Sequence, residues 1–310
     1  MKPIVYIDGK SGTTGLQIYD RLGSRSDIQL LLIPEEQRRD PALRKEYLNQ
    51  ADIVFLCLPD QAAREAVSLI ENPATRVIDA STAHRVNPDW AYGFPELSYE
   101  RRQHIMNAGR VANPGCHATG FISIVYPLVK LDILSADTPL TAFSLTGYSG
   151  GGKSMIAEYE APDRDVALDA PRQYGLNGNH KHLPEMQQVC GLTEAPVFCP
   201  IVDQYYKGME VSIPLHGSQV HGYTPEQIRD MLFEYYRNTA LITVAEEVAT
   251  SGFLSANQFA GTNQLEITVC GNKDRMVLVS RFDNLGKGAS GAAVQNMNLM
   301  LGFPETEGLV

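Results

Sequence analysis

The sequence contains no long apolar run and no dense cluster of basic residues. No stretch of its 310 residues approaches the roughly 18 apolar residues of a membrane-spanning helix, so we expect no membrane partner. Lysine and arginine total 26 against 36 for aspartate and glutamate, which gives a net charge of −10. Because binding to a phosphate backbone requires clustered positive charge, this composition argues against nucleic acid as a partner.

The sequence contains few cysteines, and their spacing matches no paired motif. The five cysteines are odd in number, lie far apart and form no C-x-x-C motif. This pattern argues against a disulfide framework or a structural zinc ribbon, and it favours a reducing, cytoplasmic compartment. The N-terminus runs directly into the apolar segment Ile4–Ile7, so we also expect no signal peptide.

The length of 310 residues corresponds to about two domains of 100–200 residues each. In the first half, short apolar runs alternate with segments of helical spacing, which predicts a doubly wound α/β sheet with strands buried on both faces. The predicted strands are Ile4–Asp8, Ile28–Ile33, Asp52–Leu58 and Arg76–Ala80, and the predicted helices are Gly12–Leu22, Pro41–Asn49 and Asp60–Glu71.

The pattern changes after about residue 115. An apolar helix is predicted over Cys116–Lys130, and helices are also predicted from Thr224 and over Ala289–Leu301. The remaining apolar runs alternate in the manner of an antiparallel or mixed sheet: Thr141–Leu145, Met209–Leu215, Gln264–Cys270 and Met276–Phe282. The second half is therefore predicted to be α+β.

A glycine-rich loop, Gly9–Gly15, follows the first predicted strand and opens the first helix. Glycines there permit a tight turn and let helix N–H groups approach a pyrophosphate, although an ordinary turn remains the alternative. After the second strand the sequence offers both Glu35 and the pair Arg38 and Arg39. Arginine accommodates the 2′-phosphate of NADP, so these residues favour NADP over NAD, and a solvated charge cluster is the alternative.

Cys116 lies between a Pro-Gly turn and the apolar helix. A thiol at a helix N-terminus is stabilised as thiolate, which suits a nucleophile, with a structural cysteine as the alternative. His180 and His182, with Glu185 nearby, suit either a metal ion or the general acid/base that a thiol nucleophile needs. Each histidine also has an alternative as a hydrogen-bonded structural residue.

The segment Gly147–Ser154 matches the P-loop pattern G-x-x-x-x-G-K-[ST] and follows a predicted strand. A P-loop NTPase that uses Lys153 is therefore the rival hypothesis. The following helix is short, because Pro162 comes eight residues after Ser154. We therefore interpret the segment as a flexible glycine-rich active-site loop.

With these segments in place, the chain resembles the N-acetyl-gamma-glutamyl-phosphate reductase family, specifically its shorter branch, over nearly the whole chain. The segments that carry the resemblance are Gly9–Gly15, Ser81–Arg85, Tyr92–Leu97, Asn113–Thr119, Gly178–Glu185 and Lys287–Asn298. The longer branch usually has Tyr-Pro after the nucleophile and His-Arg-His later, where this chain has His117-Ala118 and His180-Lys181-His182.

The resemblance implies reduction of N-acetyl-L-glutamyl 5-phosphate by NADPH, a step of arginine biosynthesis, through a thioester on Cys116. It implies His180 as the acid/base, Tyr174 as the residue that orients it, Asn113 as an oxyanion donor, and no metal. The residues expected to bind NADP(H) are Gly9, Ser11, Gly12, Thr13, Thr14, Gly15, Arg38, Arg39 and Ser81. Those expected to contact or position the substrate are Arg85, Ser149, Lys153 and Glu185.

The resemblance also implies a semialdehyde-dehydrogenase-like fold. We expect a Rossmann-type NADP-binding domain over residues 1–115 and 289–310, and an α+β catalytic and dimerisation domain with a mixed sheet over residues 116–288. A homodimer or homotetramer is expected. Another acyl-phosphate reductase, acting on an aspartyl or aminoadipyl substrate, and a non-catalytic NADPH-sensing regulator remain alternatives.

Overall fold

The computed structural model describes residues 1–38 and 40–309, and it divides into two compact units. The first unit comprises residues 1–114 and 289–310, and the second comprises residues 115–288. No helix within these described residues is long and apolar enough to cross a membrane.

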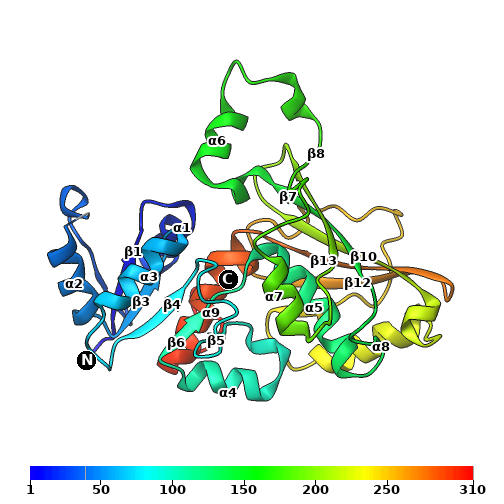
Figure 1. Cartoon of the computed structure of the whole chain (residues 1–310), viewed down its shortest axis with the longest axis horizontal. Coiled ribbons are helices and arrows are strands. Elements are labelled where there is room, and N and C mark those ends of the chain that lie inside the picture. Colours follow the sequence, from blue (N-terminus) through cyan, green and yellow to red (C-terminus); the bar gives the residue numbers. More distant parts are fainter. Residues whose placement is uncertain (39, 310) are drawn as a thin grey trace. The chain divides into compact units, whose positions relative to one another are not determined.

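A six-stranded sheet of parallel strands forms the centre of the first unit, in the order β2-β1-β3-β4-β6-β5 (Figure 1). Its strands are β1 (Ile4–Asp8), β2 (Gln29–Leu31), β3 (Ile53–Leu56), β4 (Arg76–Asp79), β5 (Ala91–Tyr92) and β6 (Arg110–Ala112). The accompanying helices are α1 (Thr13–Leu22), α2 (Pro41–Gln50), α3 (Asp60–Leu69), α4 (Tyr99–Asn107) and α9 (Gly291–Leu301). The C-terminal helix α9 packs against α1, α4 and β4, and so completes this unit.

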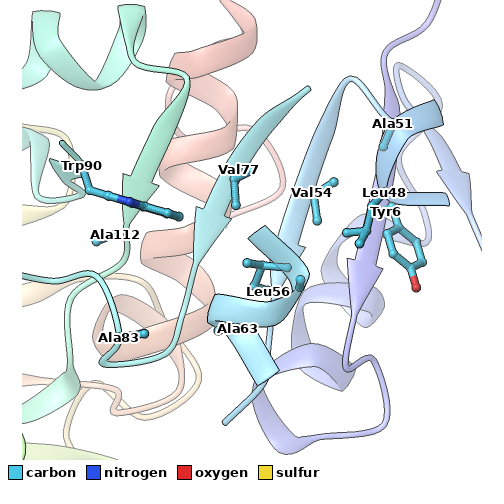
Figure 2. Close-up of a cluster of buried hydrophobic side chains, with 11 residues drawn as sticks. Tyr6, Leu48, Ala51, Val54, Leu56, Ala63, Val77, Ala83, Trp90 and Ala112 are labelled. Atoms are coloured by element: carbon cyan, nitrogen blue, oxygen red, sulfur yellow. The ribbon is translucent and has the colours of Figure 1, made fainter. Parts of the chain in front are cut away.

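The core of the first unit forms where α2 and α3 cover the sheet. Leu48 and Ala63 from these helices pack against Val54, Leu56 and Val77 of the central strands (Figure 2). All five side chains are fully buried. Strands β3 and β4 are buried along nearly their whole length, because a parallel sheet carries helices on both faces.

A seven-stranded mixed sheet forms the centre of the second unit, in the order β11-β12-β13-β10-β7-β9-β8. Its strands are β7 (Thr141–Gly147), β8 (Arg172–Gln173), β9 (Val197–Asp203), β10 (Met209–His216), β11 (Ile242–Val244), β12 (Leu265–Gly271) and β13 (Arg275–Phe282). Its helices are α5 (Cys116–Lys130), α6 (Gly152–Glu160), α7 (Leu183–Cys190) and α8 (Pro225–Tyr236).

Helix α5 packs closely on strands β10 and β13 and on α7 (Figure 1). Gly120 makes this approach possible, because a Cβ there would lie 2.4 Å from Cγ2 of Val211 and 2.8 Å from Oγ of Ser280. Eleven of the 15 residues of α5 are buried. The helix is therefore a core element, and Cys116 is its N-terminal residue.

Candidate active site

The Gly9–Gly15 loop has the backbone geometry of a tight turn against the strands. Gly9 has a φ of +87°, and a Cβ there would lie 2.3 Å from the carbonyl oxygen of Cys57. A Cβ at Gly15 would lie 2.4 Å from the carbonyl oxygen of Gly9. Among the described residues no side chain caps the N-terminus of α1 at Gly12, where Thr13 and Thr14 form the first turn. The N–H groups of that turn remain directed out of the helix, as a phosphate site requires.

A cavity of about 700 Å³ adjoins this loop. Ser11, Glu35 and Arg38 line it, together with the ends of β1 and β2. Nη1 of Arg38 donates to Oγ of Ser11 at 2.9 Å and forms an ion pair with Glu35. The predicted residues Ser11 and Arg38 thus meet at one wall of the cavity, whereas Arg39 lies outside the described residues.

In the segment after β4, the buried carboxylate of Asp79 contacts both Ser81 and His84. Asp79 accepts hydrogen bonds from the Ser81 hydroxyl at 2.8 Å and the Ser81 N–H at 2.9 Å, and lies 2.6 Å from Nδ1 of His84. Arg85 donates to the carbonyl oxygens of Asn113 at 2.9 Å and Ala80 at 3.1 Å. Ser81 and Arg85 are therefore both fixed by their neighbours.

Asn113 is buried within the first unit. Its amide Nδ2 donates to the carbonyl oxygen of Ala289 at 3.0 Å, and its Oδ1 accepts from Nδ2 of Asn296 at 3.2 Å. These contacts give Asn113 a structural function, and its predicted contribution to an oxyanion hole stays a prediction.

Cys116 is the first residue of α5. Two residues distant in the sequence, Glu185 and Gly288, contact the backbone or side chain at this position. Oε2 of the buried Glu185 accepts a hydrogen bond from the N–H of Gly115 at 3.1 Å. A Cβ at Gly288 would lie 3.0 Å from Cβ of Cys116, so the backbone there packs directly on the cysteine. The sulfur therefore lies at the positive end of a buried helix, where a thiolate is favoured.

Three histidine rings gather at this end of α5. The ring centroid of His117 lies 5.3 Å from that of His180 and 5.5 Å from that of His182. The ring centroids of His180 and His182 are 4.8 Å apart. Phe198 packs edge-on against His117 and His180. The N–H of His182 donates to Nδ1 of His180 at 3.2 Å. A neutral His180 consequently carries its proton on Nε2.

Tyr174 follows β8 and places its hydroxyl 2.6 Å from Nε2 of His117. Its ring centroid lies 6.0 Å from that of His180. Burial and the negative charge of Cys116 raise the pKa of Tyr174 well above its usual value, so the phenol stays protonated. The structure thus connects Tyr174 to His117, and the prediction that it orients His180 stays a prediction.

The Gly147–Ser154 loop has a different geometry from that of a phosphate-binding loop. The N–H groups of Gly147, Tyr148 and Ser149 donate to the carbonyl oxygens of residues 208, 205 and 206, each at 3.0 Å. The buried Ser149 hydroxyl accepts from Nδ2 of Asn284 at 3.0 Å, and Lys153 is exposed. Three N–H groups of the loop are therefore not available to a phosphate, which weighs against the rival P-loop hypothesis.

Metal binding finds no support in the arrangement of side chains. Across residues 1–38 and 40–309, no group of three or more His, Cys, Asp or Glu side chains is placed to hold an ion. The interpretation of His180 as the general acid/base stays a prediction.

Comparison with known proteins identifies the family. Residues 5–107 match the semialdehyde dehydrogenase NAD binding domain, and residues 116–284 match the semialdehyde dehydrogenase dimerisation domain. The chain belongs to the semialdehyde dehydrogenase family. The resemblance found in the sequence and the predicted fold class are thereby confirmed.

Relatives within the semialdehyde dehydrogenase family narrow this assignment. N-acetyl-gamma-glutamyl-phosphate reductase 2 of Pseudomonas putida is 45% identical over 311 residues, covering 99% of each chain. N-acetyl-gamma-glutamyl-phosphate reductase of Brucella ovis is 47% identical over 310 residues, covering 97% of this chain and 100% of that protein. The chain is thus a member of the N-acetyl-gamma-glutamyl-phosphate reductase branch, a branch of oxidoreductases.

Solved structures of the same family share the fold. Aspartate semialdehyde dehydrogenase II of Vibrio cholerae aligns with a TM-score of 0.74 at 17% identity, covering 97% of this chain and 98% of that one. Aspartate semialdehyde dehydrogenase of Candida albicans aligns with a TM-score of 0.63 at 14% identity, covering 97% and 99%. These likenesses confirm the architecture of a semialdehyde dehydrogenase.

Sequence reasoning missed two residues of this semialdehyde dehydrogenase site, His117 and Ser144. His117 is buried, and its Nδ1 lies 2.7 Å from Oγ of Ser144 on β7. The position of His117 directly after Cys116 was an available signal. Ser144 carried no such signal, because only the tertiary structure brings β7 to the start of α5.

Proposed function

We propose that the protein reduces N-acetyl-L-glutamyl 5-phosphate to N-acetyl-L-glutamate 5-semialdehyde with NADPH, releasing phosphate. The names of the relatives at 45% and 47% identity support this substrate. The observation that carries the chemistry is Cys116 at the N-terminus of buried helix α5, beside the histidine cluster. The predicted cytoplasmic location is part of this proposal, and the cysteines are free thiols, as a reducing compartment requires.

The first unit fits a bound dinucleotide. The close contacts at Gly9 and Gly15 leave no room for side chains, and the cavity beside them is large enough for part of a nucleotide. Thr13 and Thr14 would hold the pyrophosphate through their N–H groups, with Ser81 nearer the nicotinamide. Gly12 would lie beside the pyrophosphate, because its own N–H donates to the carbonyl oxygen of Gly9 at 3.0 Å. Ser11 and Arg38 would bind the 2′-phosphate, which selects NADP over NAD. NADPH, when bound, supplies the hydride that reduces the acyl group.

Cys116 forms the covalent bond to substrate. Its thiolate attacks the C5 carbonyl carbon, the bond from that carbon to the phosphate oxygen breaks, and inorganic phosphate leaves a thioester behind. The N–H of Cys116 and the positive end of α5 stabilise the oxyanion formed on the way. Glu185 keeps this end of the helix in place through the Gly115 N–H. Asn113 is the second proposed oxyanion donor.

His180 moves the proton. After reduction, its Nε2 proton passes to the former carbonyl oxygen, giving a thiohemiacetal on Cys116. His180 takes that proton back as the carbon–sulfur bond breaks, and the semialdehyde and the Cys116 thiolate are released. Tyr174 completes the proposed catalytic group, while Arg85, Ser149 and Lys153 are proposed contacts to the substrate carboxylate or phosphate.

The protein is further proposed to work as a homodimer or homotetramer. The match to a dimerisation domain over residues 116–284 supports an oligomer. On the sheet of the second unit, Phe143 of β7 and Val197 of β9 are 41% and 65% exposed. An apolar strand surface of this kind suits a partner subunit. Light scattering on the purified protein distinguishes the dimer from the tetramer.

The decisive experiment is the reverse reaction. N-acetyl-L-glutamate 5-semialdehyde, phosphate and NADP should produce NADPH absorbance, with strict dependence on phosphate and a lower rate with NAD. Cys116→Ser should abolish this rate while NADPH binding remains. Retained turnover in Cys116→Ser would refute the nucleophile. Faster turnover of aspartate semialdehyde would favour a different acyl-phosphate reductase, and NADPH binding without turnover of either aldehyde would favour a sensing function.

A further inference from the structure

Asp8 and Arg44 form a buried ion pair that no step of the proposed function uses. Asp8 is the last residue of β1, and Arg44 lies near the start of α2. Nη2 of Arg44 donates to Oδ2 of Asp8 at 2.8 Å, and the two side chains are 13% and 6% exposed. Both residues line the cavity of about 700 Å³ beside the Gly9–Gly15 loop. The pair is therefore part of the wall of the proposed nucleotide site.

Most of the hydrogen-bonding capacity of Arg44 is unused. A guanidinium carries five N–H donors. Across residues 1–38 and 40–309, Arg44 makes one hydrogen bond, the one to Asp8. Donors that are shielded from bulk solvent and left unpaired are costly. Because Arg44 lines the cavity, its other N–H groups are available to an acceptor that binds there.

Arg44 is also held in place more firmly than the other two cations that line the cavity. Nζ of Lys10 lies 3.4 Å from the centre of the Tyr19 ring, and Arg38 pairs with Glu35. The side chains of Arg38 and Glu35 are 40% and 70% exposed, so their ion pair is screened and easily exchanged. The buried pair of Arg44 is costly to separate. Arg44 is therefore oriented before a ligand binds, which reduces the entropy lost on binding.

The charge of the expected ligand requires more than one cation. A phosphate monoester such as the 2′-phosphate of NADP carries a charge of about −1.5 to −2 at pH 7. Glu35 offsets the charge of Arg38, and Arg44 comes from the same connection after β2, where a dinucleotide fold contacts the 2′ position. We propose that Arg44 is a second binding residue for the 2′-phosphate and that Asp8 positions it. This inference deepens the proposed function and rests on the assignment of NADPH to this cavity.

Asp8 has two opposing effects on a bound phosphate. Its Oδ2 holds the guanidinium of Arg44 against the cavity wall, and its negative charge repels the phosphate and offsets the charge of Arg44. A side chain that keeps the acceptor oxygen and loses the charge should therefore bind the phosphate more tightly. Asp8→Asn is that change, and it leaves no buried charge without a partner on the acidic side.

The test is isothermal titration calorimetry with two probes, 2′,5′-ADP and 5′-AMP, which differ only in the 2′-phosphate. In Asp8→Asn, the Kd for 2′,5′-ADP should fall about fivefold, because Arg44 is no longer neutralised. In the double variant Asp8→Asn/Arg44→Gln, the Kd for 2′,5′-ADP should be about tenfold or more above that of Asp8→Asn, because a charge-assisted contact is lost. The Kd for 5′-AMP should change less than about twofold.

Arg44 is replaced only together with Asp8, because Arg44→Gln alone leaves a buried carboxylate unpaired and endangers folding. The matched control is the next residue of α2, Lys45, whose Nζ lies 2.5 Å from Oε1 of Glu71. This pair is exposed and neither residue lines the cavity. Lys45→Gln/Glu71→Gln removes one ion pair from the same helix and should leave the Kd of both probes unchanged.

The outcomes separate this inference from the proposed function. Equal Kd values for 2′,5′-ADP in Asp8→Asn and the double variant, or equal changes for both probes, would overturn the inference and leave the reductase activity intact. A wild-type protein that fails the reductase assay but binds 2′,5′-ADP through Arg44 would refute the proposed reaction and support the inference. A wild-type protein that binds neither 2′,5′-ADP nor NADPH would overturn both.

Discussion

Two glycine-rich loops in this protein follow a strand and open a helix, and their backbone N–H groups have different partners. In the first unit, the Gly9–Gly15 loop borders a cavity, and the first turn of α1 has its N–H groups directed outward. In the second unit, the N–H groups of Gly147, Tyr148 and Ser149 at the start of the Gly147–Ser154 loop donate to the carbonyl oxygens of residues 208, 205 and 206. The second loop matches a nucleotide-binding pattern in sequence, yet the first is the loop that we propose for the pyrophosphate.

The difference shows that a phosphate-binding motif depends on where its N–H groups are directed. Glycines supply the turn in both loops, but a neighbouring segment competes for the donors in only one of them.

The largest effect is expected at Gly9. Gly9→Ala places a side chain at a φ of +87° and 2.3 Å from the Cys57 carbonyl oxygen. The backbone strain and the overlap together should destabilise the first unit by on the order of 3 kcal/mol. NADPH affinity should fall more than a hundredfold in fluorescence titration, with a lower melting temperature. Unchanged affinity would mean that this loop does not hold the nucleotide.

Arg38→Ala should have the next largest effect. Loss of a charge-assisted contact to the 2′-phosphate should raise the Kd for NADPH about tenfold, since the side chain of Arg38 is 40% exposed and partly screened. The Kd for NADH should stay the same. Arg64→Ala on the exposed face of α3 is the matched control. Equal losses for both cofactors would refute the 2′-phosphate assignment.

Lys153→Ala should have a smaller effect, which is limited to the binding of the acyl-phosphate substrate. The KM for this substrate should rise by less than about tenfold, because an exposed charge contributes little. NADPH binding should not change, and isothermal titration should detect no ATP binding in either protein. Loss of nucleotide affinity in this variant would restore the P-loop hypothesis and reverse the comparison.

Gly150→Ala should have the smallest effect. A Cβ there would lie 3.4 Å from Nδ2 of Asn284 and from Oγ1 of Thr146, which the side chains can accommodate. Stability should change by less than about 0.5 kcal/mol in chemical denaturation. A loss as large as that of Gly9→Ala would show that both loops are equally constrained.

The sequence predicted the elements with strong apolar periodicity and missed those without it. Helix α5 has the predicted bounds Cys116–Lys130, because its apolar residues are continuous. Helix α4 was not predicted, since a single residue of Tyr99–Asn107, Ile105, is buried and no periodic pattern exists. Strand β6, Arg110–Ala112, is too short to give an alternating signal.

The sequence by itself determined the family, the two types of sheet and the position of Cys116 at the start of a helix. The family follows from the resemblance that the motifs carry. The types of sheet and the start of the helix follow from local properties: apolar spacing, glycine in turns, and the Pro-Gly pair before an apolar run. The tertiary structure alone decided which loop has N–H groups bonded to a neighbouring segment, and which hydroxyl reaches His117. Both depend on partners tens of residues away, such as Ser144 and Glu185. A hydrogen bond forms between neighbours in space, and only folding brings those neighbours together.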